Sequence, residues 1–125
     1  MKKLLILFFA VLCFACSGDD DMDVQEPVVC TEEFVFGLSV QVRDAATNTI
    51  IPGGVTVVAQ DGSYTETLSF LFDTHVGAGE RPGSYTLTAT KEGFITKTAG
   101  PIIVVMDEDM CHVITQSVTI ELEAS

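Results

Sequence analysis

The chain has 125 residues, of which 18 are acidic and 6 are basic, and its formal net charge is −12 at pH 7. A surface of this sign repels nucleic acid and anionic membranes, so we exclude nucleic acid as a partner. The length and the 47% hydrophobic content suit one small domain with a single core.

The first sixteen residues, MKKLLILFFAVLCFAC, form a secretion-signal pattern that runs into a cysteine. Lys2 and Lys3 supply the basic start of the signal, and the apolar stretch that follows them is too short to span a bilayer comfortably. The segment resembles a bacterial lipoprotein signal, which implies removal of residues 1–15 and acylation of the Cys16 thiol. A plain secretory cut at the same place, with Cys16 left unmodified, is the alternative, because Cys13 stands where such signals usually have an aliphatic residue.

Residues 16–30 are predicted to form an acidic, flexible tether. Ser17, Gly18 and the aspartates at 19–21 resemble the acidic export signal of surface lipoproteins in bacteroidete-type bacteria. That resemblance implies a lipid-anchored protein of the outer membrane that faces the medium, with the periplasmic face as the alternative. Calcium binding by the acidic run is a weaker interpretation, because the glycine and glutamate spacing of a calcium loop is missing. Without its signal the chain keeps four basic and 18 acidic residues, a formal charge of −14.

Two further cysteines, Cys30 and Cys111, remain to be explained. A secreted chain enters an oxidising compartment, so we predict that these two cysteines form a disulfide. A metal site is the alternative, but Cys30, Cys111 and His112 offer too few ligands at this spacing. We therefore expect no metal and no cofactor.

Residues 31–125 are predicted to form one domain of short strands divided by turns. In the first strand every second residue from Phe34 to Val42 is apolar, which is typical of a strand with one buried face. Ile102–Met106 is wholly apolar and predicts a strand buried on both faces, whereas Thr74–Gly83 is expected to be the longest loop. About seven strands with frequent turns favour an all-β fold, an antiparallel β-sandwich. The predicted strands are residues 34–43, 55–60, 64–72, 84–91, 94–98, 102–106 and 111–122.

Two stretches of this domain, VQVRDAATNTIIPGGVTVVAQDGSYTETL and ERPGSYTLTATKEGFIT, carry a family pattern. The residues that carry it are Val42, Asp44, Thr47, Pro52, Gly54, Val55, Pro82, Gly83, Tyr85, Leu87, Ala89, Lys91, Gly93 and Phe94. Over roughly residues 34–122 the chain resembles the carboxypeptidase regulatory-like domains. The resemblance implies a transthyretin-like, Ig-like β-sandwich and an accessory or structural role rather than a defined activity.

No catalytic constellation emerges from the sequence, and we expect a protein that is not an enzyme. Transthyretin-like hydrolases keep a histidine and arginine cluster and a tyrosine-containing C-terminus, whereas this chain ends in ELEAS. No GxSxG or equivalent accompanies either histidine. His112 shares parity with Ile114 and is predicted to be a hydrogen-bonded core or rim residue. His75, near Asp73 in the predicted loop, is expected to be solvated.

One acidic residue falls on the apolar face of its predicted strand. Glu66 lies between Tyr64 and Leu68 in that alternation, and a buried carboxylate needs a partner. Arg81 in the ERPG segment is a candidate, so we hypothesise that Glu66 and Arg81 pair and fix the long loop to the sandwich. A solvated Glu66 at a sheet edge is the alternative.

The leading interpretation of function is a non-enzymatic, surface-anchored module that mediates binding or assembly. The exposed strand edges and the loop with His75, Glu80 and Arg81 are the expected contact surfaces. The chain has no Trp and two Tyr, which favours a protein partner over a glycan, because sugar sites usually need an aromatic platform. The alternatives are an unrecognised hydrolase or metal-dependent enzyme, which a pocket that gathers those three residues would support, and a purely structural spacer.

Overall fold

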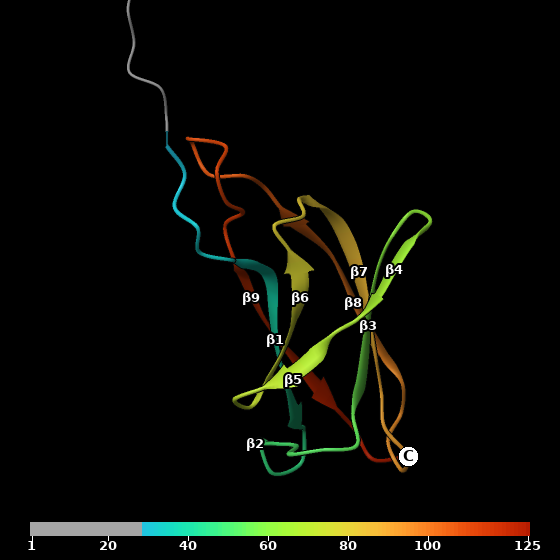
Figure 1. Cartoon of the computed structure of the whole chain (residues 1–125). Coiled ribbons are helices and arrows are strands. Elements are labelled where there is room, and N and C mark those ends of the chain that lie inside the picture. Colours follow the sequence, from blue (N-terminus) through green and yellow to red (C-terminus); the bar gives the residue numbers. More distant parts are fainter. Residues whose placement is uncertain (1–28) are drawn as a thin grey trace, which may run out of the picture.

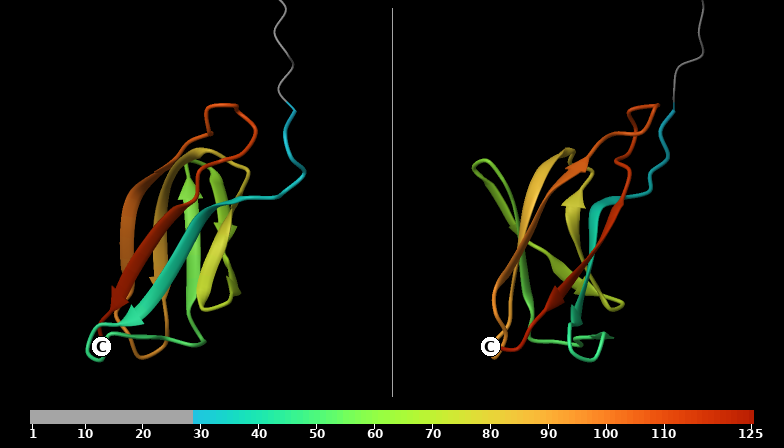
Figure 2. Two further views of the ribbon diagram at one scale, coloured as in Figure 1. Left: turned by 90° about the vertical axis from the view of Figure 1, so that its left-hand side faces the viewer. Right: turned by 180° about the vertical axis from the view of Figure 1, so that it is seen from behind.

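The computed structural model describes residues 29–125. The predicted signal, Cys16 and the predicted tether before Val29 lie outside the described residues. Within residues 29–125 all helical or strand structure is β, arranged in two sheets that pack face to face (Figures 1 and 2). The predicted all-β sandwich is therefore confirmed.

Nine strands make up the two sheets of the described chain. The first sheet consists of β1 (Phe36–Asp44), β2 (Thr49–Ile50), β5 (Ser69–Leu71), β6 (Thr74–Gly79) and β9 (Gln116–Leu122). The second sheet consists of β3 (Thr56–Asp61), β4 (Tyr64–Thr67), β7 (Gly83–Thr90) and β8 (Lys97–Val104). Neighbouring strands are antiparallel except β1 and β9, which run parallel. β1 thus lies at the centre of the first sheet, between β9 on one side and β6 and β2 on the other.

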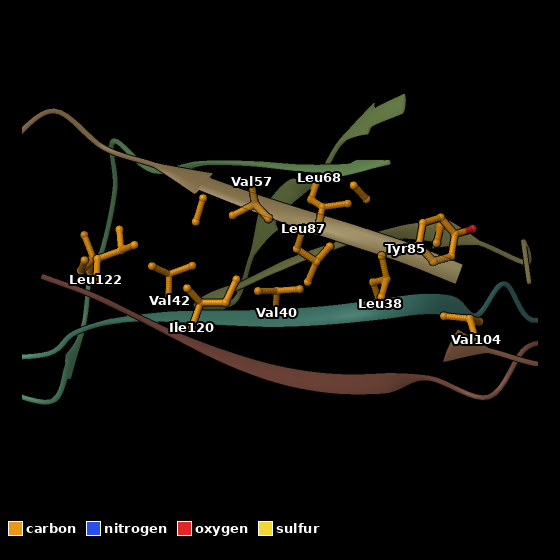
Figure 3. Close-up of a cluster of buried hydrophobic side chains, with 14 of the residues drawn as sticks. Leu38, Val40, Val42, Val57, Leu68, Tyr85, Leu87, Val104, Ile120 and Leu122 are labelled. Atoms are coloured by element: carbon orange, nitrogen blue, oxygen red, sulfur yellow. The ribbon is translucent and has the colours of Figure 1, made fainter. Parts of the chain in front are cut away.

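Alternate residues of the strands fill the space between the two sheets (Figure 3). On β1, Leu38, Val40 and Val42 are at most 1% exposed, as the alternation in the sequence predicts. The largest fully buried side chain is Tyr85 of β7, and its hydroxyl donates to the main-chain oxygen of Arg81 at 2.7 Å. A buried tyrosine that bonds back to the chain just before its strand fixes the corner at which that strand begins.

β4 and β5 belong to one segment that passes from the second sheet to the first (Figure 1). β4 pairs with β3, and β5 pairs with β6. Between them Leu68 is buried in the core, and its N–H donates to the main-chain oxygen of Val57 at 2.8 Å. The predicted strand over residues 64–72 therefore has about the right extent, but the structure divides it between two sheets.

The opposite side of the sandwich is closed where β8 faces β9. At one end the N–H of Ile95 donates to the oxygen of Glu123 at 2.8 Å. At the other end the N–H of Ile114 donates to the oxygen of Val105 at 2.9 Å. These main-chain bonds join the two sheets beyond the ends of their strands, so this side offers few unpaired main-chain groups at its ends.

The segment predicted to be the longest loop, Thr74–Gly83, contains β6, and that prediction is wrong. Its glycines suggested a loop, but small residues are needed here because the crossing segment lies directly over β6. A methyl group on Gly77 would collide with the side chains of Leu68 and Glu66. The glycine content of β6 therefore reflects close packing rather than a turn.

The apolar run Ile102–Met106 is buried on one face only, so the prediction of two buried faces is wrong. Val104 is 2% exposed, whereas Ile103 and Val105 are 54% and 47% exposed. Its first residues belong to β8, which also passes through Pro101, a residue that lies between the predicted strands 94–98 and 102–106. β8 lies at the edge of its sheet, and an edge strand tolerates a residue without an N–H on its free side.

The predicted disulfide between Cys30 and Cys111 is confirmed. It joins the segment before β1 to the loop before β9, and its two Cα atoms are 5.3 Å apart. The described chain therefore enters the sandwich at a fixed point, at the end opposite the C-terminus (Figure 1). Residues 29–125 hold no helix of the length and apolarity needed to cross a membrane.

Removal of the disulfide by Cys30→Ser with Cys111→Ser is expected to lower the free energy of unfolding by about 2–5 kcal/mol. The two cysteines are 81 residues apart, so their bond restricts a large part of the unfolded chain. Urea titration with and without reductant measures the effect. The double variant is the control, since reductant should leave its midpoint unchanged, and an unchanged midpoint on reducing the wild type would contradict the prediction.

Candidate functional site

A small apolar patch projects from the sandwich at the turn between β5 and β6. Phe70, Leu71 and Phe72 are 41%, 44% and 96% exposed. Single exposed apolar side chains are ordinary on protein surfaces, whereas three in succession at the end of a hairpin make this turn a candidate contact surface. The β5 hairpin lies toward the end of the sandwich opposite the one where the chain enters (Figures 1 and 2).

Phe72 has an unfavourable backbone conformation. Leu71 pairs with Thr74, so the turn consists of Phe72 and Asp73, whose φ angles are 50° and 69°. Two-residue turns of this kind favour asparagine and glycine, because a side chain in the left-handed region costs about 1–2 kcal/mol. Packing does not offset this cost, since Phe72 is almost fully exposed. The contacts of the described fold do not explain a phenylalanine at this position, so Phe72 is a candidate functional residue.

Phe70, in contrast, has a structural role, because its ring covers His75. The two ring centroids are 4.8 Å apart, and His75 is 3% exposed. Burial lowers the pKa of His75, so the imidazole is neutral at pH 7. The expectation that His75 is solvated in a loop is wrong, because the residue lies in β6 opposite Val40 of β1.

The segment from Tyr64 to Leu71 leaves one edge of β4 and the opposite edge of β5 unpaired, because Ser69 and Leu71, which pair with β6, alternate with the residues that bond to β3. β4 is the last strand of the second sheet and β5 the last strand of the first, and within residues 29–125 neither has a strand on its other side. Edge strands usually carry a lysine, a proline or an outward charge that prevents pairing with another chain. YTETLSFLF has no lysine and no proline, and its one charged residue, Glu66, points inward. We refer to the two short outer edges of β4 and β5, together with Phe72, as the open edge.

Glu66 lies between the two sheets and links them. Its Oε1 accepts a hydrogen bond from the Tyr64 hydroxyl at 2.8 Å and another from the main-chain N–H of Ala78 in β6 at 2.9 Å. The bond to Glu66 raises the pKa of Tyr64 above its usual value of 10.0. Glu66 is therefore not the solvated edge residue of the alternative interpretation, and its carboxylate holds β4 against β6.

Arg81 pairs with Asp61, so the predicted Glu66–Arg81 ion pair is wrong. Its Nη1 lies 3.1 Å from Oδ2 of Asp61 and 2.9 Å from the Tyr85 hydroxyl oxygen. The guanidinium also stacks on the Tyr64 ring, 3.7 Å from its centroid. Glu66 and Arg81 are connected only through Tyr64, whose hydroxyl donates to Glu66. The sequence could not show that Asp61 is the partner of Arg81, because only the fold of the β3–β4 turn brings Asp61 nearer to Arg81 than Glu66 is.

Glu80 connects three separate parts of the chain at the end where the chain enters. Its Oε2 accepts from the N–H of Val35 at 3.0 Å and lies 2.6 Å from Nδ1 of His112. Its Oε1 accepts from the N–H of Val113 at 3.1 Å. The prediction that His112 is a hydrogen-bonded rim residue is confirmed. The bond raises the pKa of His112 and lowers the pKa of Glu80, so the charged pair is favoured.

The Thr31 hydroxyl, the His112 imidazole and the Glu80 carboxylate form a continuous chain of hydrogen bonds. Oγ1 of Thr31 lies 2.9 Å from Nε2 of His112. Serine hydrolases use groups in this order, and there the imidazole accepts the proton of the hydroxyl. Here the raised pKa of His112 favours the imidazolium, which has no free lone pair for that proton. Both oxygens of Glu80 also bind main-chain N–H groups, which is the arrangement of a structural link.

The structure separates the three residues expected to form one contact loop. His75 lies at the β5 end of β6 and is buried, whereas Glu80 and Arg81 follow the other end of β6. No pocket is found among residues 29–125, and no group of three or more histidine, cysteine or acidic residues there could hold a metal ion. His75 is therefore excluded as a contact residue by its burial, and Glu80 and Arg81 act mainly within the fold.

The open edge was only partly visible in the sequence. The sequence predicts contact surfaces at strand edges, but it places Phe72 at the end of a strand rather than in a turn. The available signal was the run Phe70-Leu71-Phe72, which interrupts the alternation and is followed at once by Asp73. Three consecutive apolar residues cannot all face the core of a sandwich.

Comparison with known proteins identified no relative of this chain. No model of a known protein family matches the chain, and no curated protein matches it either. What the fold and the site define is a class: a small, acidic, disulfide-bonded β-sandwich with one side closed by main-chain bonds and the other left as an unprotected edge.

A double-mutant cycle should show that Arg81 is coupled to Asp61 more strongly than to Glu66. Arg81→Ala is expected to lower the melting midpoint, and Asp61→Ala should add little to it, because both changes break the same ion pair. Arg81→Ala and Glu66→Gln should be closer to additive. Arg43→Ala, which removes a surface arginine bonded to Gln41, is the control. Stronger coupling to Glu66 than to Asp61 would contradict the described contacts.

The Glu80–His112 pair should stabilise the fold most at about pH 4.5–6.5. The raised pKa of His112 adds stability that is complete below its ordinary 6.5 and is lost as pH rises through the folded value. The lowered pKa of Glu80 adds stability that is present above 4.5 and is lost as pH falls through its folded value.

The measurement is the difference in melting midpoint between the wild type and His112→Asn, followed from pH 4 to pH 9. The difference isolates His112 from His75, whose lowered pKa has the opposite effect, because the unfolded chain takes up its proton first. We expect the largest difference near pH 5.5 and a smaller one at pH 9. A difference that grows toward pH 9 would be the contrary result.

Phe72→Asn is expected to stabilise the protein by up to about 1 kcal/mol, because asparagine tolerates the left-handed conformation better than phenylalanine. Ile95→Asn is the matched control: Ile95 is 53% exposed but does not have a positive φ, so no gain is expected. Phe70→Ala should destabilise, since it uncovers His75. Urea titration of the three variants measures these changes, and a loss of stability with Phe72→Asn would show that Phe72 packs on the fold.

Proposed function

We propose that this protein is a non-enzymatic lipoprotein of the outer membrane that is exposed on the cell surface and acts as a binding or assembly module. The acyl group on Cys16 holds it to the membrane, and residues 16–30 serve as its tether. Residues 31–125 are the binding domain, of the carboxypeptidase regulatory-like, transthyretin-like kind that the sequence resembles. The partner is a protein, and it contacts the open edge.

The observation that carries this proposal is the exposed, strained Phe72 at the end of an unprotected strand edge. A fold retains an unfavourable residue when function requires it, and stability alone would favour asparagine or glycine at this turn. The patch lies away from the end at which the chain enters the sandwich (Figure 1). A domain tethered at that end presents the β5–β6 turn, with Phe72, away from its anchor.

A protein partner is favoured over a glycan by the positions of the tyrosines. The chain has no Trp, and its two tyrosines serve the fold: Tyr85 is fully buried, and Tyr64 lies beneath Arg81. Neither offers the open ring face on which a sugar stacks. The apolar side chains of the open edge instead suit a recess on another protein, where apolar contact provides most of the binding energy.

Photo-crosslinking on intact cells tests the proposed contact. Benzoylphenylalanine replaces Phe72, which keeps an aromatic side chain at the turn, and in a matched strain it replaces Ile95. We expect a discrete, light-dependent adduct from position 72 and none from position 95. Equal adducts from both positions, or none from position 72, would contradict a binding role for the open edge.

Protease treatment of the same intact cells tests the location separately. Release of peptides from the domain, with an acylated Cys16 retained in the membrane, is the expected result. Protection of the domain until the outer membrane is broken would place it in the periplasm and would redirect the search to envelope proteins.

A further inference from the structure

The outer face of the second sheet carries no charged residue. Along β7 every second residue from Tyr85 to Ala89 is fully buried, so the residues between them point away from the core. The register places each of these beside an outward residue of a neighbouring strand, as Thr88 lies between Val58 of β3 and Thr98 of β8. The outward residues of the sheet are Thr56, Val58, Gln60, Thr65, Thr67, Ser84, Thr86, Thr88, Thr90, Thr98 and Ile103. We refer to these residues as the threonine face, since seven of them are threonine.

An uncharged face is unexpected on so acidic a chain. Residues 29–125 carry 13 acidic and four basic residues, and none of these belongs to the threonine face. The outer face of the first sheet is charged in the usual way, with Arg43 of β1 opposite Glu121 of β9. Lys97 of β8 pairs with the buried Ala89, and its ammonium donates to the main-chain oxygen of Glu121 in the other sheet. Depletion of charge is what distinguishes the core of a protein interface from the rest of a surface.

An apolar stripe continues the threonine face beyond the end of β8. Ile103 and Val105 are 54% and 47% exposed, whereas Val104 between them is buried. Ile114, which is 46% exposed, lies beside Val105, because its N–H donates to the Val105 oxygen at 2.9 Å. Removal of these three side chains from water is favourable, so the face and the stripe together form a surface that gains free energy when it is covered.

Charge selects a second copy of the chain as the occupant of this surface. A cationic partner finds no carboxylate on the threonine face, and an anionic bilayer is repelled by the carboxylates around it. The match for an uncharged face is another uncharged face, and the chain itself supplies one. A threonine hydroxyl both donates and accepts hydrogen bonds, so a face of threonines is complementary to its own copy. A two-fold arrangement brings the two faces together and leaves the acidic residues outside the contact.

We infer that two copies of this chain associate as a symmetric pair through their threonine faces, with the apolar stripe of each copy in the same contact. At about 3.3 Å per residue and about 4.8 Å between strands, the second sheet covers about 400 Å² in projection. Even with the relief of the side chains, this lies at the lower end of specific interfaces, which bury about 800 Å² per partner. The pair is therefore weak and reversible. The inference goes beyond the proposed function and does not depend on a contact at Phe72.

Photo-crosslinking in the cells that make the protein captures a weak pair at its natural concentration. Two versions of the full chain with different affinity tags are expressed together, and benzoylphenylalanine replaces Thr98 in one of them. We expect a light-dependent adduct that carries both tags. Thr119, an exposed threonine on the outer face of β9, is the matched control position and should give no such adduct.

Charge exchange at Thr86 tests whether the threonine face meets its own copy. Thr86→Glu in both copies should lower the yield of the two-tag adduct about tenfold or more, because like charges within one contact are costly. Thr86→Lys in both copies should do the same. Glutamate in one copy and lysine in the other should restore the adduct, which also shows that both variants fold. Thr119→Glu in both copies is the control and should leave the yield unchanged.

The contrary results are equally specific. Adducts of position 98 with a different protein, in place of the second copy, would overturn the inference and assign the face to that protein. Equal two-tag adducts from positions 98 and 119, none from position 98, or no restoration by the mixed charges would overturn it as well. An adduct from position 72 without a two-tag adduct from position 98 leaves the proposed function standing and refutes the pair. The reverse result refutes the contact at Phe72 and leaves the pair standing.

Discussion

The structure depends on one segment that belongs to both sheets. Residues 64–71 begin as an edge strand of the second sheet and end as an edge strand of the first, with Leu68 buried at the crossing. The segment thereby fastens the sheets together on one side of the sandwich, as the main-chain bonds between the ends of β8 and β9 do on the other. Within the described chain no further strand pairs with the outer side of β4 or of β5.

Polar contacts hold this crossing in place where an apolar core alone would leave it free to shift. The Glu66 carboxylate bonds β4 to the main chain of β6, and Tyr64 carries that contact on to Arg81. Arg81 in turn fixes the β3–β4 turn through Asp61. Hydrogen bonds to a charged group contribute more than neutral ones, and an unpaired carboxylate here would be costly, so the network specifies one position for the crossing segment.

The strand pattern and the disulfide could be predicted because each follows from local sequence or from simple pairing. Alternation in β1 indicates its buried face, and the expectation of a secreted chain favours a disulfide between the two remaining cysteines. Contacts between segments could not be read in the same way. Glycines in β6 suggested a loop, although Gly77 is small because Leu68 and Glu66 lie over it.

The candidate site shows the same division between local and long-range information. The alternation places Glu66 on the inward face of its strand, but it does not show its partners. Only the folded chain brings the N–H of Ala78 to Glu66 and Asp61 to Arg81. The strain at Phe72 was also invisible, because a positive φ is a property of the hairpin and not of the residue. The sequence did suggest that strand edges matter, and the structure identifies which edge lacks protection.

Residue-resolved amide hydrogen exchange tests the central claim, that residues 64–71 cross between the sheets and that β4 keeps an unpaired outer edge. The N–H of Leu68, bonded to Val57 in the core, should be among the slowest to exchange. The N–H groups of Thr65 and Thr67, on the same segment but facing outward, should exchange far faster, at rates close to those of exposed loops. Slow exchange at all three positions would mean that the edge is already paired, and fast exchange at Leu68 would mean that the crossing is not fixed; either result contradicts the account.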